Sequence, residues 1–169
     1  MLLLSGLLGA FLGAMMTFGF NMWKFHRDER NARCDELCKA IWDAGILASD
    51  YWSKKFDDSN TQAVQEARIV AAQTLMDGLY ADFDEYLSSK TKDLDGHFSD
   101  LLDKLSGGQF TEEDRPIDLA RAAMAPRVAG VTIVALRRLY RESIPFHGLG
   151  KAIRENRRRV LDMPIPRPR

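Results

Sequence analysis

The sequence predicts an all-α protein in which a single N-terminal transmembrane helix is followed by an antiparallel helical bundle. Three observations support this prediction. The chain opens with an uncharged stretch, apolar residues recur at helical spacing through most of the remainder, and no segment alternates as a β-strand does. The expected divisions are a transmembrane helix at 1–23, a helical bundle at 24–162 and an extended tail rich in Pro and Arg at 163–169.

The opening stretch carries no charged side chain from Leu2 to Trp23. As a helix it extends for about 33 Å, enough to cross a hydrocarbon core of about 30 Å. A cleavable signal would have basic residues before its apolar run and small residues at its end. Here no basic residue precedes the run, and it ends in the bulky sequence FGFNMW. We therefore expect a retained membrane span, rather than a cleaved signal or a buried soluble helix.

The charges beside this stretch predict its orientation. Basic residues follow it and none precede it, so the positive-inside bias places Met1 outside and the body in the cytoplasm. An aromatic residue at the exit suits the interfacial belt of a membrane. The residues expected at the membrane interface are Trp23, Lys24, Arg27 and Arg30.

Small residues recur four apart within the stretch. One row contains Gly9, Gly13 and Thr17, and a second row contains Gly6, Ala10 and Ala14. Small side chains let two helix backbones approach closely, which is a main route to association in lipid. The alternative is that Gly and Ala are simply common in spans. We expect these two rows to mediate self-association.

The first helix of the body is expected to continue directly out of the span as far as Phe56. Its apolar face is widened by Trp42 and Trp52. The sequence at 57–60 breaks it, and Thr61 is the expected cap of the next helix. The apolar face of this first helix contains Leu37, Ile41, Ala44, Ala48 and Tyr51.

A second helix is expected to end near Ser88, and a third to end at Gly107 and Gly108. Each shows an apolar stripe at helical spacing. The stripe of the second helix contains Val64, Ala67, Ala71, Leu75, Leu79, Phe83 and Tyr86. The stripe of the third contains Leu94, Phe98, Leu101 and Leu105.

The last third predicts further helices. Pro116 is expected in the first turn of one of them, and Pro126 is expected to kink or end it. Its apolar face would contain Ile117, Ala120 and Met124. The run 128–140 is too short in uncharged residues to span a membrane, so a core helix is expected there. A basic amphipathic helix is expected at about 149–161.

The net charge of zero hides a division. Residues 57–115 carry 14 acidic and 5 basic side chains, whereas residues 116–169 carry 4 acidic and 12 basic. The expected bundle is thus acidic over 57–115 and basic over 116–162. The basic surface contains Arg137, Arg138, Arg141, Lys151, Arg154, Arg157, Arg158 and Arg159. Its partner could be the acidic middle of the chain, anionic lipid, or a nucleic acid or acidic protein.

No motif predicts a catalytic, cofactor or metal site. Gly148 and Lys151 lie in a sequence that lacks the spacing of a nucleotide-binding loop, and 93–96 lacks principal ligands of a calcium loop. Cys34 and Cys38 lack the second ligand pair that zinc requires. Their helical spacing also gives poor disulfide geometry, so two free thiols are expected. We expect no cofactor and no metal.

These observations favour a non-enzymatic, membrane-anchored adaptor, scaffold or regulatory subunit that self-associates and binds a protein in the same membrane or in the cytoplasm. Membrane lipid is an expected partner. Nucleic acid is not an expected partner, because few aromatic residues accompany the arginines. The alternative is a small pore-forming or membrane-disrupting effector gated by its helical domain. A hydrolase whose carboxylates meet only in the fold is a third class.

Overall fold

A computed structural model of the chain describes residues 2–56, 60–84, 86–87, 92–113 and 115–143. Four helices account for 87% of these residues, and no strand occurs among them, so the all-α prediction is confirmed. The helices are α1 (Leu2–Trp52), α2 (Asn60–Asp84), α3 (Lys92–Ser106) and α4 (Leu119–Ser143).

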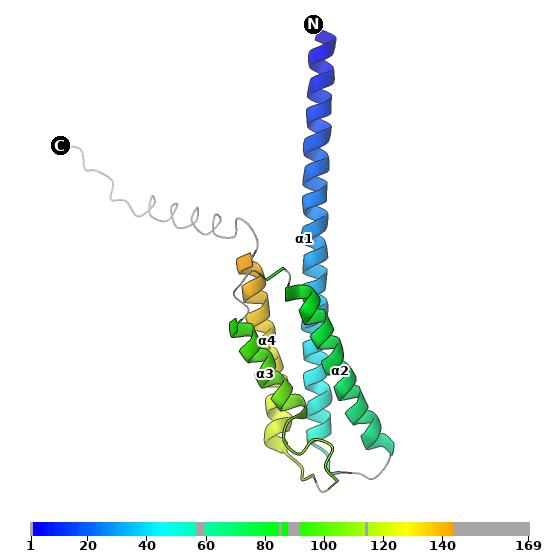
Figure 1. Cartoon of the computed structure of the whole chain (residues 1–169), viewed down its shortest axis with the longest axis vertical. Coiled ribbons are helices and arrows are strands. Elements are labelled where there is room, and N and C mark those ends of the chain that lie inside the picture. Colours follow the sequence, from blue (N-terminus) through cyan, green and yellow to red (C-terminus); the bar gives the residue numbers. More distant parts are fainter. Residues whose placement is uncertain (1, 57–59, 85, 88–91, 114, 144–169) are drawn as a thin grey trace, which may run out of the picture.

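The four helices alternate in direction and form an antiparallel bundle (Figure 1). The C-terminal half of α1 packs against both α2 and α4, and α3 lies mainly against α4. The N-terminal half of α1 projects beyond the bundle as a single straight continuation of the same helix (Figure 1). The C-terminal end of α4 therefore lies at the end of the bundle from which α1 projects.

The expected apolar face of α1 is confirmed. Leu37, Ile41, Ala44, Ala48 and Tyr51 are all buried, as is Trp52. The residues of this face are spaced alternately three and four apart, which keeps one side of a helix against its neighbours. Trp42 is 46% exposed, so its predicted place in the core is wrong. It lies about 100° around the helix from Ile41.

The apolar stripe predicted for α2 is largely wrong. The buried residues are Gln62, Ile69, Met76 and Phe83, which recur every seven positions. Of the predicted stripe, Phe83 is buried and Leu79 and Tyr86 are partly buried, whereas Val64, Ala67, Ala71 and Leu75 are exposed. Apolar residues surround α2, so the pattern alone did not identify the face that meets α1.

The predicted face and end of α3 are confirmed. Leu94, Phe98, Leu101 and Leu105 are buried. The helix ends at Ser106, and Gly108 follows with a φ of 69°, a conformation that favours glycine.

The expected start of α4 is wrong. The helix begins at Leu119, where Asp118 acts as its cap by accepting a hydrogen bond of 2.8 Å from the backbone nitrogen of Arg121. Pro116 therefore precedes the helix. The apolar face predicted for its start, containing Ile117, Ala120 and Met124, is exposed because the buried side of α4 begins at Ala122 and Ala125.

Of the two outcomes expected at Pro126, a kink or an end of the helix, the end does not occur, because Pro126 lies inside α4. A proline within a helix costs about 3 kcal/mol. Buried residues on both sides of it pack into the bundle and offset this cost. The buried residues of α4 are Ala122, Ala125, Val128, Ala129, Thr132, Leu136 and Tyr140.

Among the described residues, one helix has the length and apolar composition that crossing a membrane requires, and it is α4. One third of its apolar stretch (33%) is buried within the bundle. The expectation of a core helix over 128–140 is confirmed, since five of its residues are buried, whereas the expectation that it is too short to span is wrong. The basic helix expected at 149–161 and the tail at 163–169 lie outside the described residues.

Candidate functional site

The N-terminal half of α1 presents a long apolar surface. The large apolar side chains that the structure describes in this segment are between 43% and 77% exposed. A contiguous exposed apolar surface of this kind marks a site that contacts a membrane or another protein. The exposed large apolar residues of this segment are Leu7, Phe11, Leu12, Met15, Met16, Phe18, Phe20, Met22, Trp23 and Phe25.

The small residues predicted to mediate self-association lie on the same projecting segment. A Cβ added to Gly6, Gly9 or Gly13 would meet no atom within 4 Å. The rows are completed by Ala10, Ala14 and Thr17, which are exposed. Among the described residues, therefore, no other part of the chain packs against these rows, and they are open to a second helix.

The residues predicted at the membrane interface lie on α1 shortly before Cys34, where the buried face of the helix begins. The guanidinium of Arg27 lies 5.1 Å from the centroid of the Trp23 ring, and that of Arg30 lies 4.9 Å from the ring of Tyr86. Lys24 is exposed. Such cation–π contacts hold the arginines against aromatic faces while their charges stay near the surface.

The end of α4 that carries Arg137 and Arg141 packs beside residues 31–35 of α1, because the two helices are antiparallel. Arg137 forms an ion pair of 3.0 Å with Asp35, and the Tyr140 hydroxyl donates a hydrogen bond of 2.6 Å to Asn31 Oδ1. The sequence indicated two separate basic groups, and the fold places their described members at one end of the bundle. The remaining predicted members, Lys151, Arg154, Arg157, Arg158 and Arg159, lie outside the described residues.

A pocket of about 490 Å³ opens between α1 and α4 at this end. Sequence reasoning missed it, since its two sides are separated by about a hundred positions in the chain. Its lining offers two guanidinium groups and a side-chain amide against one carboxylate. The residues that line it are Asn31, Cys34, Asp35, Val134, Arg137, Tyr140 and Arg141.

The two cysteines are free and buried next to this pocket. The pKa of Cys38 is lowered to about 7, first by a hydrogen bond with the Cys34 thiol and then by a hydrogen bond with Arg137 and the charge of that residue, while burial opposes these effects. The pKa of Cys34 is raised, first by its hydrogen bond with Cys38 and then by burial. The pair therefore favours a single thiolate beside Arg137.

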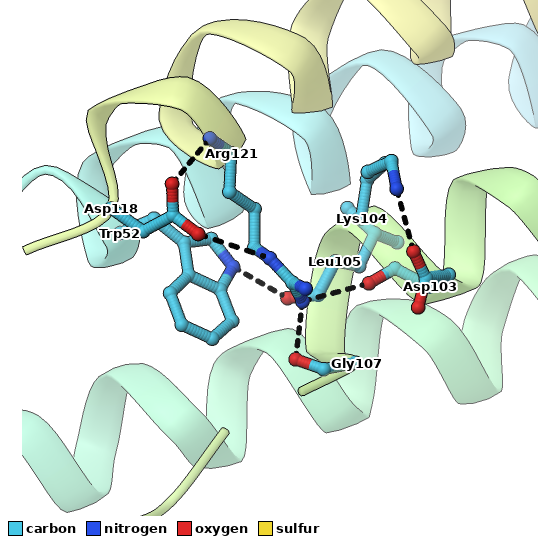
Figure 2. A network of polar contacts seen from close by, with 7 residues as sticks. All are labelled: Trp52, Asp103, Lys104, Leu105, Gly107, Asp118 and Arg121. Atoms are coloured by element: carbon cyan, nitrogen blue, oxygen red, sulfur yellow. Dashed lines mark hydrogen bonds and ion pairs between the residues drawn. The ribbon is translucent and has the colours of Figure 1, made fainter. Parts of the chain in front are cut away.

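The opposite end of the bundle is closed by a polar network (Figure 2). The Trp52 indole donates a hydrogen bond of 3.1 Å to the Leu105 carbonyl. Arg121 lies 4.6 Å from the Trp52 ring and donates to the carbonyls of Asp103 and Gly107. These contacts hold the end of α3 between α1 and α4. We therefore assign this end a structural role. The candidate site is the other end of the bundle, called the basic end here, where Arg137 and Arg141 line the pocket.

Within the described parts of the chain, no three His, Cys, Asp or Glu side chains gather as metal ligands would. Comparison with protein-family models, with curated proteins and with solved structures finds no match for this chain.

Proposed function

We propose that the chain is a non-enzymatic, single-span membrane protein that self-associates through α1 and holds its helical bundle against the cytoplasmic leaflet. There it binds a protein partner as an adaptor or regulatory subunit. The observation that carries the proposal is the unbroken helix α1, whose N-terminal half extends past the bundle with its large apolar side chains exposed.

The energy of exposed apolar surface supports α1 as the span. Burying one large apolar side chain is worth about 1.5–3 kcal/mol, and many such side chains lie along the projecting half of α1. The apolar helix α4 differs, because its core residues Ala129, Thr132 and Leu136 are fully buried in the bundle. Moving α4 into a membrane would dismantle the core, whereas inserting the N-terminal half of α1 would not.

The charges at the basic end support the proposed orientation. Lys24, Arg27 and Arg30 follow the apolar segment, and Arg137 and Arg141 lie at the same end of the bundle. The cytoplasmic leaflet carries anionic lipid, and each Lys or Arg near it gains about 1 kcal/mol. The proposed arrangement therefore places Met1 outside and the bundle inside.

No observation favours the alternative of a pore. The Thr17 hydroxyl donates a hydrogen bond of 2.8 Å to the Gly13 carbonyl within its own helix. That bond uses one of the few polar groups of the segment, and ion pathways are normally lined by charged rings or carbonyls. We therefore keep the proposal to an anchored, partner-binding protein.

Extraction of membranes at alkaline pH tests the anchor. Full-length protein is expected to stay with the membrane pellet, and a Phe11→Arg/Met15→Arg variant is expected to shift to the soluble fraction. The matched control, Val64→Arg/Leu75→Arg, places the same charges on exposed positions of α2 and is expected to stay in the pellet. Release of the unmodified protein would overturn the proposal.

Purification from detergent-solubilised membranes tests the partner. A protein that co-elutes with the full-length chain and is lost when the bundle is deleted is expected. Elution of the chain with no other protein would contradict the adaptor function while leaving the anchor intact.

A further inference from the structure

We propose that the pocket between α1 and α4 binds a phosphate group, supplied by the headgroup of an anionic lipid or by a soluble phosphorylated compound. The pocket belongs to the bundle itself, and only the lipid source rests on the proposed membrane anchor. Its volume of about 490 Å³ lies within the range of small-molecule sites, about 300–1,000 Å³.

Arg141 is the main cation of the site. Its Nε donates a hydrogen bond of 3.2 Å to the Arg137 carbonyl, which fixes the side chain along α4. Among the described residues Arg141 has no acidic partner, although it lines the pocket. Its two terminal nitrogens are therefore available for the two-pronged hydrogen bonding that guanidinium groups make with phosphate.

Asn31 supplies neutral donors on the opposite wall. Its Oδ1 accepts the hydrogen bond from the Tyr140 hydroxyl, which orients the amide and leaves its Nδ2 hydrogens as donors. Tyr140 itself is buried and part of the core. The amide is thus fixed by a rigid neighbour, as a binding group requires.

The balance of charge around the pocket favours an anion. Arg137 is paired with Asp35, and among the described residues that line the pocket this carboxylate is the one acidic group. Arg27 and Arg30 lie close enough for their charges to act on the Tyr140 hydroxyl. In the described lining of the pocket, a phosphate would meet the repulsion of one carboxylate, Asp35, and the attraction of two guanidinium groups, Arg137 and Arg141.

The height of the pocket above the membrane limits the lipid source. Asn31 lies eight residues beyond Trp23, which is about 12 Å along α1. The polar headgroup layer is roughly 5–7 Å thick on each side. A simple phosphodiester would not reach the pocket, so a lipid ligand would carry an additional phosphate monoester on an extended headgroup.

Thiol labelling provides a reporter at the site itself. The chain has 2 cysteines, and Cys34 lines the pocket while Cys38 is buried beside it. A ligand that occupies the pocket is expected to slow the reaction of full-length protein with a small maleimide by several-fold. The protein is held in phosphatidylcholine nanodiscs and compared at equal ionic strength with added potassium chloride, with inorganic phosphate, with phosphatidylserine or with phosphatidylinositol phosphate.

Protection by inorganic phosphate or by phosphatidylinositol phosphate, without protection by chloride or phosphatidylserine, is the expected result. Protection by inorganic phosphate alone assigns a soluble source, and protection by the phosphorylated lipid alone assigns a lipid source. Equal protection by phosphatidylserine, or no protection in any arm, overturns the proposal. If alkaline extraction releases the protein while inorganic phosphate still slows its labelling, the proposed pocket stands and the proposed membrane function fails.

Three variants distinguish phosphate binding in the pocket from a general effect of the charge on the surface. Arg141→Gln removes the main cation, and Asn31→Asp replaces the amide with a carboxylate while keeping an oxygen for the Tyr140 hydroxyl. Both are expected to abolish protection. Arg138→Gln is the matched control, because Arg138 is exposed, pairs with Glu142 and does not line the pocket. Loss of protection in Arg138→Gln equal to that in Arg141→Gln would also overturn the proposal.

Discussion

Gly45 on α1 faces Ala129 on α4 so closely that a Cβ added to Gly45 would lie 2.9 Å from the Ala129 Cβ. The same Cβ would lie 3.3 Å from the Ala125 carbonyl oxygen and from the Pro126 Cα. These neighbours are backbone or Cβ atoms, which cannot move aside as the end of a flexible side chain can. The contact between α1 and α4 therefore requires glycine at this position.

We expect Gly45→Ala to lower the free energy of unfolding by up to about 2 kcal/mol. Overpacking costs about 1–3 kcal/mol, and the better helix propensity of alanine returns about 1 kcal/mol. Gly78→Ala on α2 is the matched control, because a Cβ there meets nothing within 4 Å, and it is expected to stabilise. Urea unfolding of full-length protein in detergent, followed by circular dichroism, measures both. Equal stabilisation by the two variants would contradict the close contact.

The buried side of α2 gives a second prediction. Met76 is fully buried and Leu75 is 55% exposed, although the sequence pattern favoured Leu75 for the core. We expect Met76→Ala to cost about 2–5 kcal/mol, because it leaves a cavity between packed helices. Leu75→Ala is expected to cost less than about 1 kcal/mol, as exposed substitutions usually do. The same unfolding measurement checks the pair, and a larger loss for Leu75→Ala would show that α2 packs by its other face.

The thiol pair predicts a pH dependence of stability. The pKa of Cys38 is lowered to about 7 from its ordinary value of 9.0, so the unfolded chain binds more protons between these values. The free energy of unfolding is therefore expected to rise with pH from about 7 to 9. Above pH 9 the raised pKa of Cys34 reverses the slope, because the folded state then retains its proton.

Urea unfolding at several pH values measures this effect as the difference between the native chain and a Cys34→Ala/Cys38→Ala variant. Subtracting the free energy of unfolding of the variant removes the contribution of the other titrating groups. A difference that stays constant across this range would contradict a shared thiolate.

The two rows of small residues predict the effect of bulk on self-association. Crosslinking of full-length protein in membranes is expected to give dimers or larger species, and Gly9→Leu/Gly13→Leu is expected to reduce them strongly because the backbones can no longer approach. Gly19→Leu is the matched control, since Gly19 is equally open but lies outside both rows. A chain that crosslinks only as a monomer, or a control that loses as much as the double variant, would argue against association through these rows.

The accuracy of the sequence-based predictions varied with the contrast between the two sides of each helix. In α3 and the C-terminal half of α1, apolar residues alternate three and four apart against charged neighbours, and the buried face followed directly from the pattern. In α2, Val64 and Leu75 are as apolar as Ile69 and Met76, and only contact with α1 distinguishes them. Pro126 was misjudged because the packing around it outweighs its local preference.

The pocket could not be predicted from spacing. Asn31 and Arg141 are brought together by the antiparallel pairing of α1 and α4, and neither belongs to a recognisable motif. The sequence did contain a partial signal, since it marked basic residues both after the apolar stretch and near Arg137. What it lacked was the topology that places both groups at one end of the bundle.

Because α1 is unbroken, it also fixes how the bundle is rotated about the helix axis relative to the glycine rows. Leu2–Trp52 contains neither proline nor loop, so Gly13 and Asn31 are joined by a rod that resists twisting. One alanine inserted between them would turn the bundle by about 100° about the axis, whereas seven would return it to within about 20°. In a dimer held by the glycine rows, the direction in which each pocket opens is therefore determined by the number of α1 residues between the rows and the pocket.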